Sequence, residues 1–211
     1  DNNNTKMADL NLLRNEAQRI LKLLQRETID FFNIAPMKCA FEHDPEYLEK
    51  LGYNISVLKQ EGLIRFACAD TFSGEETNLR MIQSGYFDVI YINFNFADYQ
   101  AQNRVMKAAK AQKMGVITRE AYMKGQLFHM AKEAGIEQIS DLADAALRWS
   151  LSREGVDMVI YGTGKPEHLR DASEAFEKKF SELDERLISR IMQTQLYKAY
   201  EAEKNKEFLE L

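Results

Sequence analysis

The sequence has little of what several kinds of protein site require. Its 211 residues include three histidines and two cysteines, and Cys39 and Cys68 lack the spacing of a zinc or iron–sulfur site. A chain of this size scarcely needs a disulfide to fold, so both thiols are predicted to be reduced. These absences predict that the protein holds no metal.

No apolar run in the chain approaches the roughly 18 residues that cross a bilayer. The chain has 28 Lys and Arg against 33 Asp and Glu, mixed along its length, with a net charge of -5 and a pI near 5.4. Binding to a phosphate backbone needs a basic surface, which this pattern excludes. We therefore expect a soluble protein with neither nucleic acid nor membrane as a partner.

The first residues, Asp1 to Asn4, have neither the basic start nor the apolar stretch of a secretory signal. The expected location is the cytoplasm. Because the chain opens on Asp1 and not on Met, we also expect it to begin at an internal boundary, such as a cleavage point or the edge of an ordered region.

Apolar runs of strand length alternate with segments of helical period along the whole chain. The strand candidates are 29–35, 64–69, 89–96, 115–118 and 158–161. The helix candidates are 6–25, 45–59, 75–84, 98–112, 139–152 and 182–209. The strands are mostly apolar on both faces, which is typical of parallel strands buried between helices and a core. The pattern predicts one α/β domain over residues 1–211.

Right-handed crossovers between parallel strands are compatible with an open doubly wound sheet and with an arc of a barrel. Periodicity does not choose between these two folds. No Gly-x-Gly-x-x-Gly follows a strand candidate, so a Rossmann dinucleotide site has no support.

Four stretches resemble motifs of the aldo-keto reductase superfamily, in the order of its barrel strands four to eight. Residues 28–32 (TIDFF) are similar to the family's D-Y-I-D-L-Y, and residues 58–65 (LKQEGLIR) to its L-K-x-E-G-K-I-R. Residues 86–95 (YFDVIYINFN) resemble F-D-V-x-Q-x-x-Y-N. The fourth stretch is similar to A-L-R-W followed by V-I-P-G-x-x-x-P-E-x-L, and consists of residues 145–149 (AALRW), 159–162 (VIYG) and 165–169 (KPEHL).

The resemblance covers about residues 6–190 and implies a TIM-type (β/α)8 barrel, of which this chain carries strands four to eight and the C-terminal helix. Five strands of such a barrel leave two unpaired edges and a half-filled interior. Strands one to three are therefore expected from a longer chain or, less favoured, from another copy of this one.

The resemblance gives this chain none of the family's catalytic residues. The family takes a Tyr acid, a Lys and an Asp from its early strands, which are absent here. The His that follows strand four falls on Ala35, which has no proton to give and no donor for a developing oxyanion.

The positions that hold the nicotinamide in the family are altered. The Ser-Asn pair after strand five becomes Asp70-Thr71, and the Gln on strand six becomes Tyr91. The stacking aromatic after strand seven falls on Arg119, and Glu120 follows it. These charged residues are candidates for a cofactor site, and the alternative is an internal ion pair that replaces the family's site.

Asn95, at the end of strand six, is the candidate substrate contact.

The residues expected around the cofactor phosphate match the family's pattern better than those around the nicotinamide. The turn of Gly162, Thr163 and Gly164 joins the last strand to a helix whose free N–H groups favour an anion. The resemblance places Lys165 near the 2′-phosphate of NADP(H).

His168 takes a similar position near the 2′-phosphate, and Asp171 one near adenine. The residues alone also allow Lys165 to be a solvated loop lysine and the glycines to do no more than form a turn.

Three functions remain open. The first is an NADP-dependent oxidoreductase that acts on a small carbonyl or alcohol, with its catalytic Tyr, Asp and Lys from a segment outside this chain. The second is a non-catalytic relative that keeps the barrel for binding or regulation. The third is an oligomeric scaffold built on the helix over 182–209, and the alternative is that the apolar side chains of this helix cover the barrel.

Overall fold

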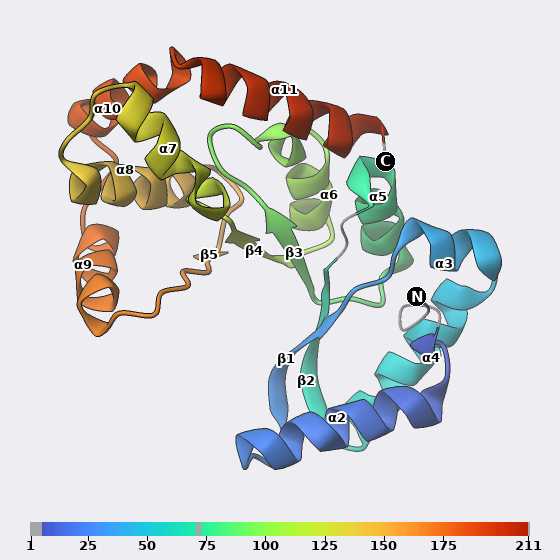
Figure 1. The fold of residues 1–211 in the computed structure, drawn as a ribbon. Helices are drawn as coiled ribbons and strands as arrows, with labels where there is room; N and C mark the ends of the chain where they lie inside the picture. The colour runs from blue at the N-terminus through green and yellow to red at the C-terminus, as the bar shows by residue number, and fades with distance from the viewer. Residues whose placement is uncertain (1–5, 71–72, 211) are drawn as a thin grey trace. The chain divides into compact units, whose positions relative to one another are not determined.

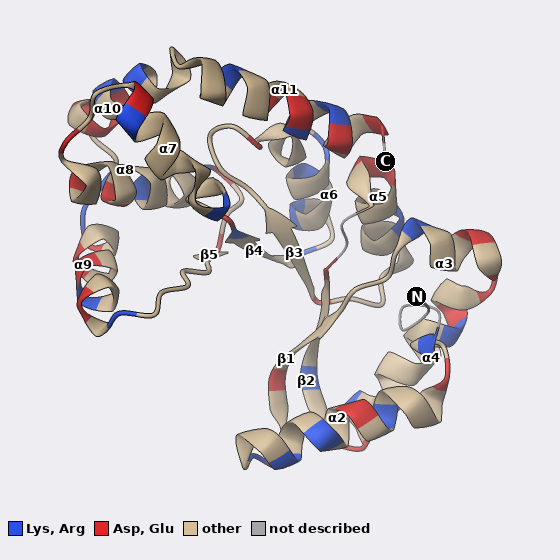
Figure 2. Cartoon of the chain, in the orientation of Figure 1, with Lys and Arg blue, Asp and Glu red and all other residues tan. Residues whose placement is uncertain are grey.

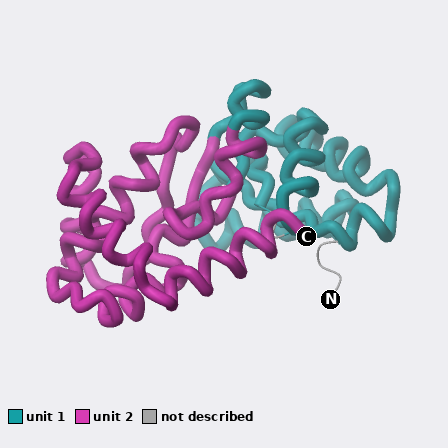
Figure 3. Tube along the Cα trace, turned by 90° about the horizontal axis from the view of Figure 1, so that it is seen from above, with its two compact units in different colours: residues 1–91, 107–115, 211 teal, residues 92–106, 116–210 magenta. Residues whose placement is uncertain are grey.

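The computed structural model describes residues 6–70 and 73–210 (Figure 1). The chain divides into two compact units, of which unit 1 comprises residues 1–91, 107–115 and 211, and unit 2 comprises 92–106 and 116–210 (Figure 3). Each unit is described by itself.

Five strands form one sheet in the order β1-β2-β3-β4-β5. They are β1 (Ile29–Ile34), β2 (Ile64–Ala69), β3 (Val89–Asn93), β4 (Gly115–Arg119) and β5 (Met158–Val159). The pairing is parallel and each strand lies beside the next one in sequence, which is the order of a barrel wall and not of a doubly wound sheet. The predicted α/β fold, a partial barrel, is confirmed.

Unit 1 surrounds the long β1–β2 pair, in which Ile29 faces Ile64 and Ile34 faces Ala69. Its helices are α2 (Leu10–Leu24), α3 (Lys38–His43), α4 (Tyr47–Gln60) and α5 (Gly74–Ser84). Asp88 ties the start of β3 to this unit, because its carboxylate accepts the backbone N–H of Ala67 at 2.8 Å and pairs with Lys59 at 2.6 Å.

The expectation that the strands are buried on both faces is wrong at two aromatic residues of unit 1. The side chains of Phe31 and Phe66 are 47% and 37% exposed, and their rings stack at 5.6 Å. They border a cavity of about 430 Å³. The neighbouring Phe32, which points to the other face of β1, is buried. At these two positions one face of the β1–β2 pair is therefore open to solvent.

Unit 2 contains β5, most of β4 and a layer of helices (Figure 1). Its elements include η1 (Gln100–Gln102), η2 (Met123–Gly125), α7 (Gln126–Glu133), α8 (Ile139–Leu151), α9 (Pro166–Phe176), α10 (Glu182–Met192) and α11 (Gln195–Glu210). Helix α6 (Val105–Ala111) contributes residues to both units. The core of unit 2 joins Leu127, Ala145, Ile188 and Tyr197 from four different helices.

The single helix predicted over 182–209 is wrong, because the structure divides it into α10 and α11. The hydroxyl of Thr194 accepts the N–H of Tyr197 at 3.1 Å. The carboxylate of Glu133 on α7 accepts the N–H groups of Gln195 and Leu196 at 2.7 and 3.2 Å. These acceptors satisfy the free N–H groups of a new helix start, so the chain turns there.

Both cysteines are free, Cys39 exposed and Cys68 buried. Across residues 6–70 and 73–210, no helix has the length and hydropathy that crossing a membrane would require. His43 is the last residue of α3, and it is exposed.

Candidate functional site

The carboxyl ends of β3 and β4 bring three of the predicted site residues together in unit 2. Arg119 closes β4, and its Nε donates to Asn93 Oδ1 at 2.6 Å. Glu120 follows with φ +64°, a left-handed conformation that is uncommon for a residue with a side chain. The side-chain amide of Asn95 donates to the backbone carbonyl of Glu120 at 3.0 Å, which joins the two strand ends.

Asn95 also forms the turn that follows β3. Its Oδ1 accepts the N–H groups of Ala97 and Asp98 at 2.9 and 3.0 Å, and the residue is 1% exposed. These bonds give Asn95 a structural role, because an amide that satisfies three backbone groups fixes the turn. Its substrate contact stays a prediction.

The turn between β5 and α9 joins the last strand to a helix, as the sequence predicts. The Thr163 hydroxyl lies 3.3 Å from Nδ1 of His168 and accepts the N–H of Lys165 at 3.2 Å. Lys165 is the N-cap of α9 and Pro166 its first residue. No side chain caps this helix start, so its N–H groups face the turn without a side-chain acceptor.

Two neighbouring cavities, together called the groove, lie within unit 2 near this turn and the end of β4. One part, of about 310 Å³, lies between the turn and helix α8, and a second, of about 330 Å³, lies between the ends of β4 and β5. The two parts share the lining residues Tyr122, Phe128, Tyr161 and Gly162. The ring of Tyr122 lies 5.5 Å from that of Phe128 and 5.6 Å from that of Tyr161, so the shared wall is aromatic.

The predicted residues contribute unequally to this groove. Thr163, His168 and Asp171 line the part beside α8, Glu120 lines the other part, and Gly162 lines both. The groove's described lining includes neither Gly164 nor Lys165, although the exposed Lys165 lies at its rim through the bond to Thr163.

Several groove residues were missed by sequence reasoning. Tyr122 lies three residues beyond Arg119, where the resemblance had placed the stacking aromatic, so an aromatic is present but displaced along the chain. Asp144 comes from α8 and has no motif of its own. The pairing of β4 with β5 and the packing of α8 together bring these residues to the groove.

The charges of the groove are mixed. Lys124 Nζ lies 3.4 Å from Glu120 Oε1, which balances one acid with one base. Asp144 is half-buried, and burial raises the pKa of its carboxyl above the ordinary value although Arg148 and Lys178 oppose the shift. An anion would therefore bind at the exposed end of the groove, where Lys165 and the start of α9 lie.

The remaining predicted positions belong to unit 1. Asp70 follows β2 directly, is 7% exposed, and donates its N–H to the carbonyl of Ile34 at 2.9 Å. Ala35 follows β1 and is half-buried. Tyr91 lies on β3. Thr71 falls outside the described residues.

The comparisons with known proteins agree with the fold. Residues 97–193 match the model of the Aldo/keto reductase family. No match is found among curated protein sequences. Among solved structures, the holo form of the aldo-keto reductase AKR11C1 from Bacillus halodurans is similar with a TM-score of 0.71 and 16% identity, over 87% of this chain and 65% of that one.

The glycerol dehydrogenase AKR11B4 from Gluconobacter oxydans is similar with a TM-score of 0.68 and 18% identity, over 88% of this chain and 64% of its own. The thermostable aldo-keto reductase Tm1743, solved with the inhibitor epalrestat, has a TM-score of 0.64 and 19% identity over 85% of this chain and 65% of its own. These findings confirm the resemblance to the aldo-keto reductases and their fold. This chain spans slightly less than two thirds of the length of each of these three structures.

Proposed function

We propose that the groove binds the adenosine half of NADP(H), and that the protein is an oxidoreductase that moves hydride between the nicotinamide and a small carbonyl or alcohol. The observation that carries this proposal is the groove itself, at the carboxyl ends of β4 and β5 and beside the start of α9. Parallel α/β barrels place their chemistry at this end of their strands.

Three features of the groove suit an adenosine group. Its shared wall is aromatic, which favours a flat base. Thr163 and Asp171 offer polar atoms to a ribose or to the amino group of adenine. At the rim, Lys165, His168 and the N–H groups of α9 favour the 2′-phosphate.

The dinucleotide, when bound, would supply the hydride to a carbonyl or accept it from an alcohol, and the groove residues of this chain would bind and orient it. The proton donor would come from elsewhere, because Ala35 stands where the resemblance places a His and the family's Tyr, Lys and Asp belong to strands that this chain lacks. We propose that a further segment of polypeptide supplies them, with a second copy of this chain as the alternative source.

A non-catalytic binding or regulatory protein is the second candidate. The observation that favours it is the set of altered positions, because Ala35, Asp70, Tyr91 and Arg119 replace the groups that the family uses around the nicotinamide. Such a protein would still bind the dinucleotide through the groove, but it would not reduce a carbonyl compound even when its barrel is complete.

We also propose a small-molecule substrate and a cytoplasmic location. The free state of both cysteines supports a reducing compartment. A homo-oligomer follows only if a second copy supplies the missing barrel wall, and native mass spectrometry of the purified chain would show whether it forms.

The experiment that tests the proposal is a titration of NADPH, and separately of NADH, into the purified protein, followed by nicotinamide fluorescence. Lys165→Ala should weaken NADPH binding by roughly 10- to 100-fold, since a hydrogen bond to a charged group is worth about 1.5–3 kcal/mol. NADH binding should not change, because NADH lacks the 2′-phosphate.

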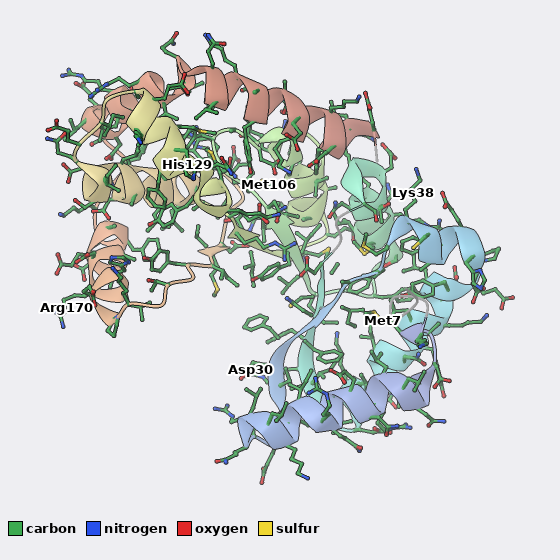
Figure 4. The ribbon with its side chains drawn as sticks, viewed as in Figure 1. Met7, Asp30, Lys38, Met106, His129 and Arg170 are labelled. Carbon is green, nitrogen blue, oxygen red and sulfur yellow. The ribbon has the colours of Figure 1, made fainter. Side chains whose placement is uncertain are left out.

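Arg170→Ala is the matched control. This arginine lies on the same helix but on its outer side (Figure 4). Equal NADPH affinity of the Lys165→Ala and Arg170→Ala proteins would contradict the assignment of the phosphate end. A carbonyl-reduction assay on the protein with a completed barrel then separates the two candidate functions.

A further inference from the structure

Helix α11 has an unusual inner face. Tyr197 is its one buried residue among those described, and the half-buried positions that follow include Tyr200, Glu201, Lys204 and Asn205. Acidic and basic residues are interspersed along its length (Figure 2). A helix that covers a protein core normally buries an apolar stripe, so apolar burial alone does not hold this helix in place. It packs on η1, α7 and α10 within unit 2.

Two carboxyl groups lie beneath this helix, at the ends of neighbouring strands. Asp98 closes the turn after β3 and is 6% exposed. Glu120 follows β4, its side chain is 12% exposed, and its left-handed backbone fixes its direction. The buried Glu120 Oε2 and Tyr200 Oη find no hydrogen-bond partner among the described residues. A buried polar group without a hydrogen bond costs free energy, so the contact between α11 and the strand ends is only marginally stable.

The groups that face Asp98 come from two sides. The end of β4 and η2 contribute Glu120 and Lys124, which pair at 3.4 Å. Helix α11 contributes Lys204 and Glu207, which pair at 2.5 Å. Each of these two lysines thus pairs with an acid other than Asp98.

We infer that the C-terminal half of α11 is a pH-responsive clamp, docked on the ends of β3 and β4 while Asp98 is protonated and loosened when Asp98 is ionised. The inference does not depend on dinucleotide binding, because it concerns contacts within unit 2 in the protein without ligand.

The titration of Asp98 supports the direction of this switch. Burial raises the pKa of Asp98 to about 7, Lys204 and Lys124 oppose the shift, and Glu120 and Glu207 add to it. Burial, with nearby acids including Glu120, also raises the pKa of Tyr200 above its ordinary value, so this phenol stays neutral.

At a pH between its two pKa values, a carboxyl whose pKa is raised in the docked state is protonated when the helix is docked and ionised when the helix is released. Docking should therefore weaken as pH rises from about 4 to 7, by up to about tenfold per unit, and level off above the docked-state pKa.

The first turns of α11 have a separate anchor. The hydroxyl of Tyr197 donates to the carbonyl of Phe96 at 2.9 Å, and the two rings stack at 6.0 Å. Neither interaction involves a carboxyl that titrates near neutrality. The movement should therefore be confined to residues 200–210, while α10 and the start of α11 stay packed.

Hydrogen exchange of the full chain tests the clamp. Protection of residues 200–210, corrected for intrinsic exchange and compared with residues 182–192 of α10 in the same sample, should fall at least tenfold between pH 5 and pH 8. In Asp98→Asn, which stays neutral, the ratio should stay constant. Asp141→Asn, on the exposed first turn of α8, should behave as the wild type does.

Three results would overturn the inference. One is a protection ratio that does not change with pH in the wild type, and another is an Asp98→Asn protein that keeps the wild-type pH dependence. If Asp98→Asn fails to fold, the carbon-13 NMR shift of the Asp98 carboxyl in the wild type decides the matter. A midpoint near 7 supports the clamp, and a midpoint below 5 overturns it.

Discussion

Replacing Asp184 by Asn should destabilise unit 2 more than any surface change. The Asp184 carboxylate, in the first turn of α10, accepts bonds from Arg148 Nε at 3.0 Å and Nη2 at 2.6 Å. It also accepts the backbone N–H and the hydroxyl of Ser181, each at 2.9 Å, in the capping box that starts α10. The side chains of Arg148 and Asp184 are 10% and 2% exposed, so each charge is buried and is compensated by the other.

The magnitude follows from this burial. Removing one partner of a buried ion pair leaves the other charge uncompensated and costs about 3–5 kcal/mol. An Asn side chain can still accept one hydrogen bond, so the lower end of that range applies. At about 2–4 °C per kcal/mol for a chain of this size, the midpoint of thermal unfolding should fall by roughly 6–12 °C.

The assay is urea unfolding followed by fluorescence of Trp149, the single tryptophan, which lies beside Arg148 and packs 5.3 Å from Phe94. The matched control is Glu182→Gln, because Glu182 lies in the same helical turn but is 88% exposed. A free energy of unfolding for Asp184→Asn within 0.5 kcal/mol of this control, about the scatter expected of a surface substitution, would refute the reasoning.

The pH dependence provides a second check on the same pair. Burial by itself would raise the pKa of Asp184, but the bonds from Arg148 and Ser181 outweigh it and hold the pKa below the ordinary value. A carboxyl with a lowered pKa in the folded state stabilises the protein above the unfolded-state pKa and loses that contribution as pH falls through the folded one. The wild type should therefore lose stability in acid by an amount that Asp184→Asn does not show.

Two further pairs of substitutions test local packing. Gly52→Ala should cost about 1–3 kcal/mol in urea unfolding, because a Cβ at this position would lie 2.5 Å from Cγ of Tyr86, whereas Gly164→Ala, with no atom within 4 Å of its Cβ, should be neutral. Phe32→Ala should cost about 3–5 kcal/mol and Phe31→Ala much less, because Phe32 is 4% exposed and Phe31 is 47% exposed. Equal losses within either pair would contradict the assigned packing.

The helices and strands were predicted well where neighbouring residues determine their bounds. The strand over 64–69 is found at its predicted bounds, because Gly62, with φ +73°, ends the preceding helix and an apolar run follows. The tail helix was predicted too long because Glu133, on a different helix, supplies acceptors for a new helix start. A contact across 62 residues leaves no trace in local periodicity.

The residues of the candidate site also divide into those that the local sequence predicts and those that only tertiary packing brings in. The step from Gly162 into the helix that begins at Pro166 was predicted because a motif fixes a local chain path. Asp144 was missed because it reaches the groove only through tertiary packing of α8. The left-handed conformation of Glu120 could not be predicted either, since the residue type gives no sign of it and the bond from Asn95 that accompanies it crosses between strands.

The measurement that tests the central claim most directly is the binding of adenosine 2′,5′-bisphosphate, compared with 5′-AMP, mapped by backbone NMR shifts. The adenosine groove lies wholly within unit 2, so binding does not need the strands that this chain lacks. We predict saturable shifts at Tyr122, Tyr161 and the turn over 162–168, with tighter binding of the bisphosphate. Shifts elsewhere, or equal affinity for the two nucleotides, would contradict a site for NADP(H) in this groove.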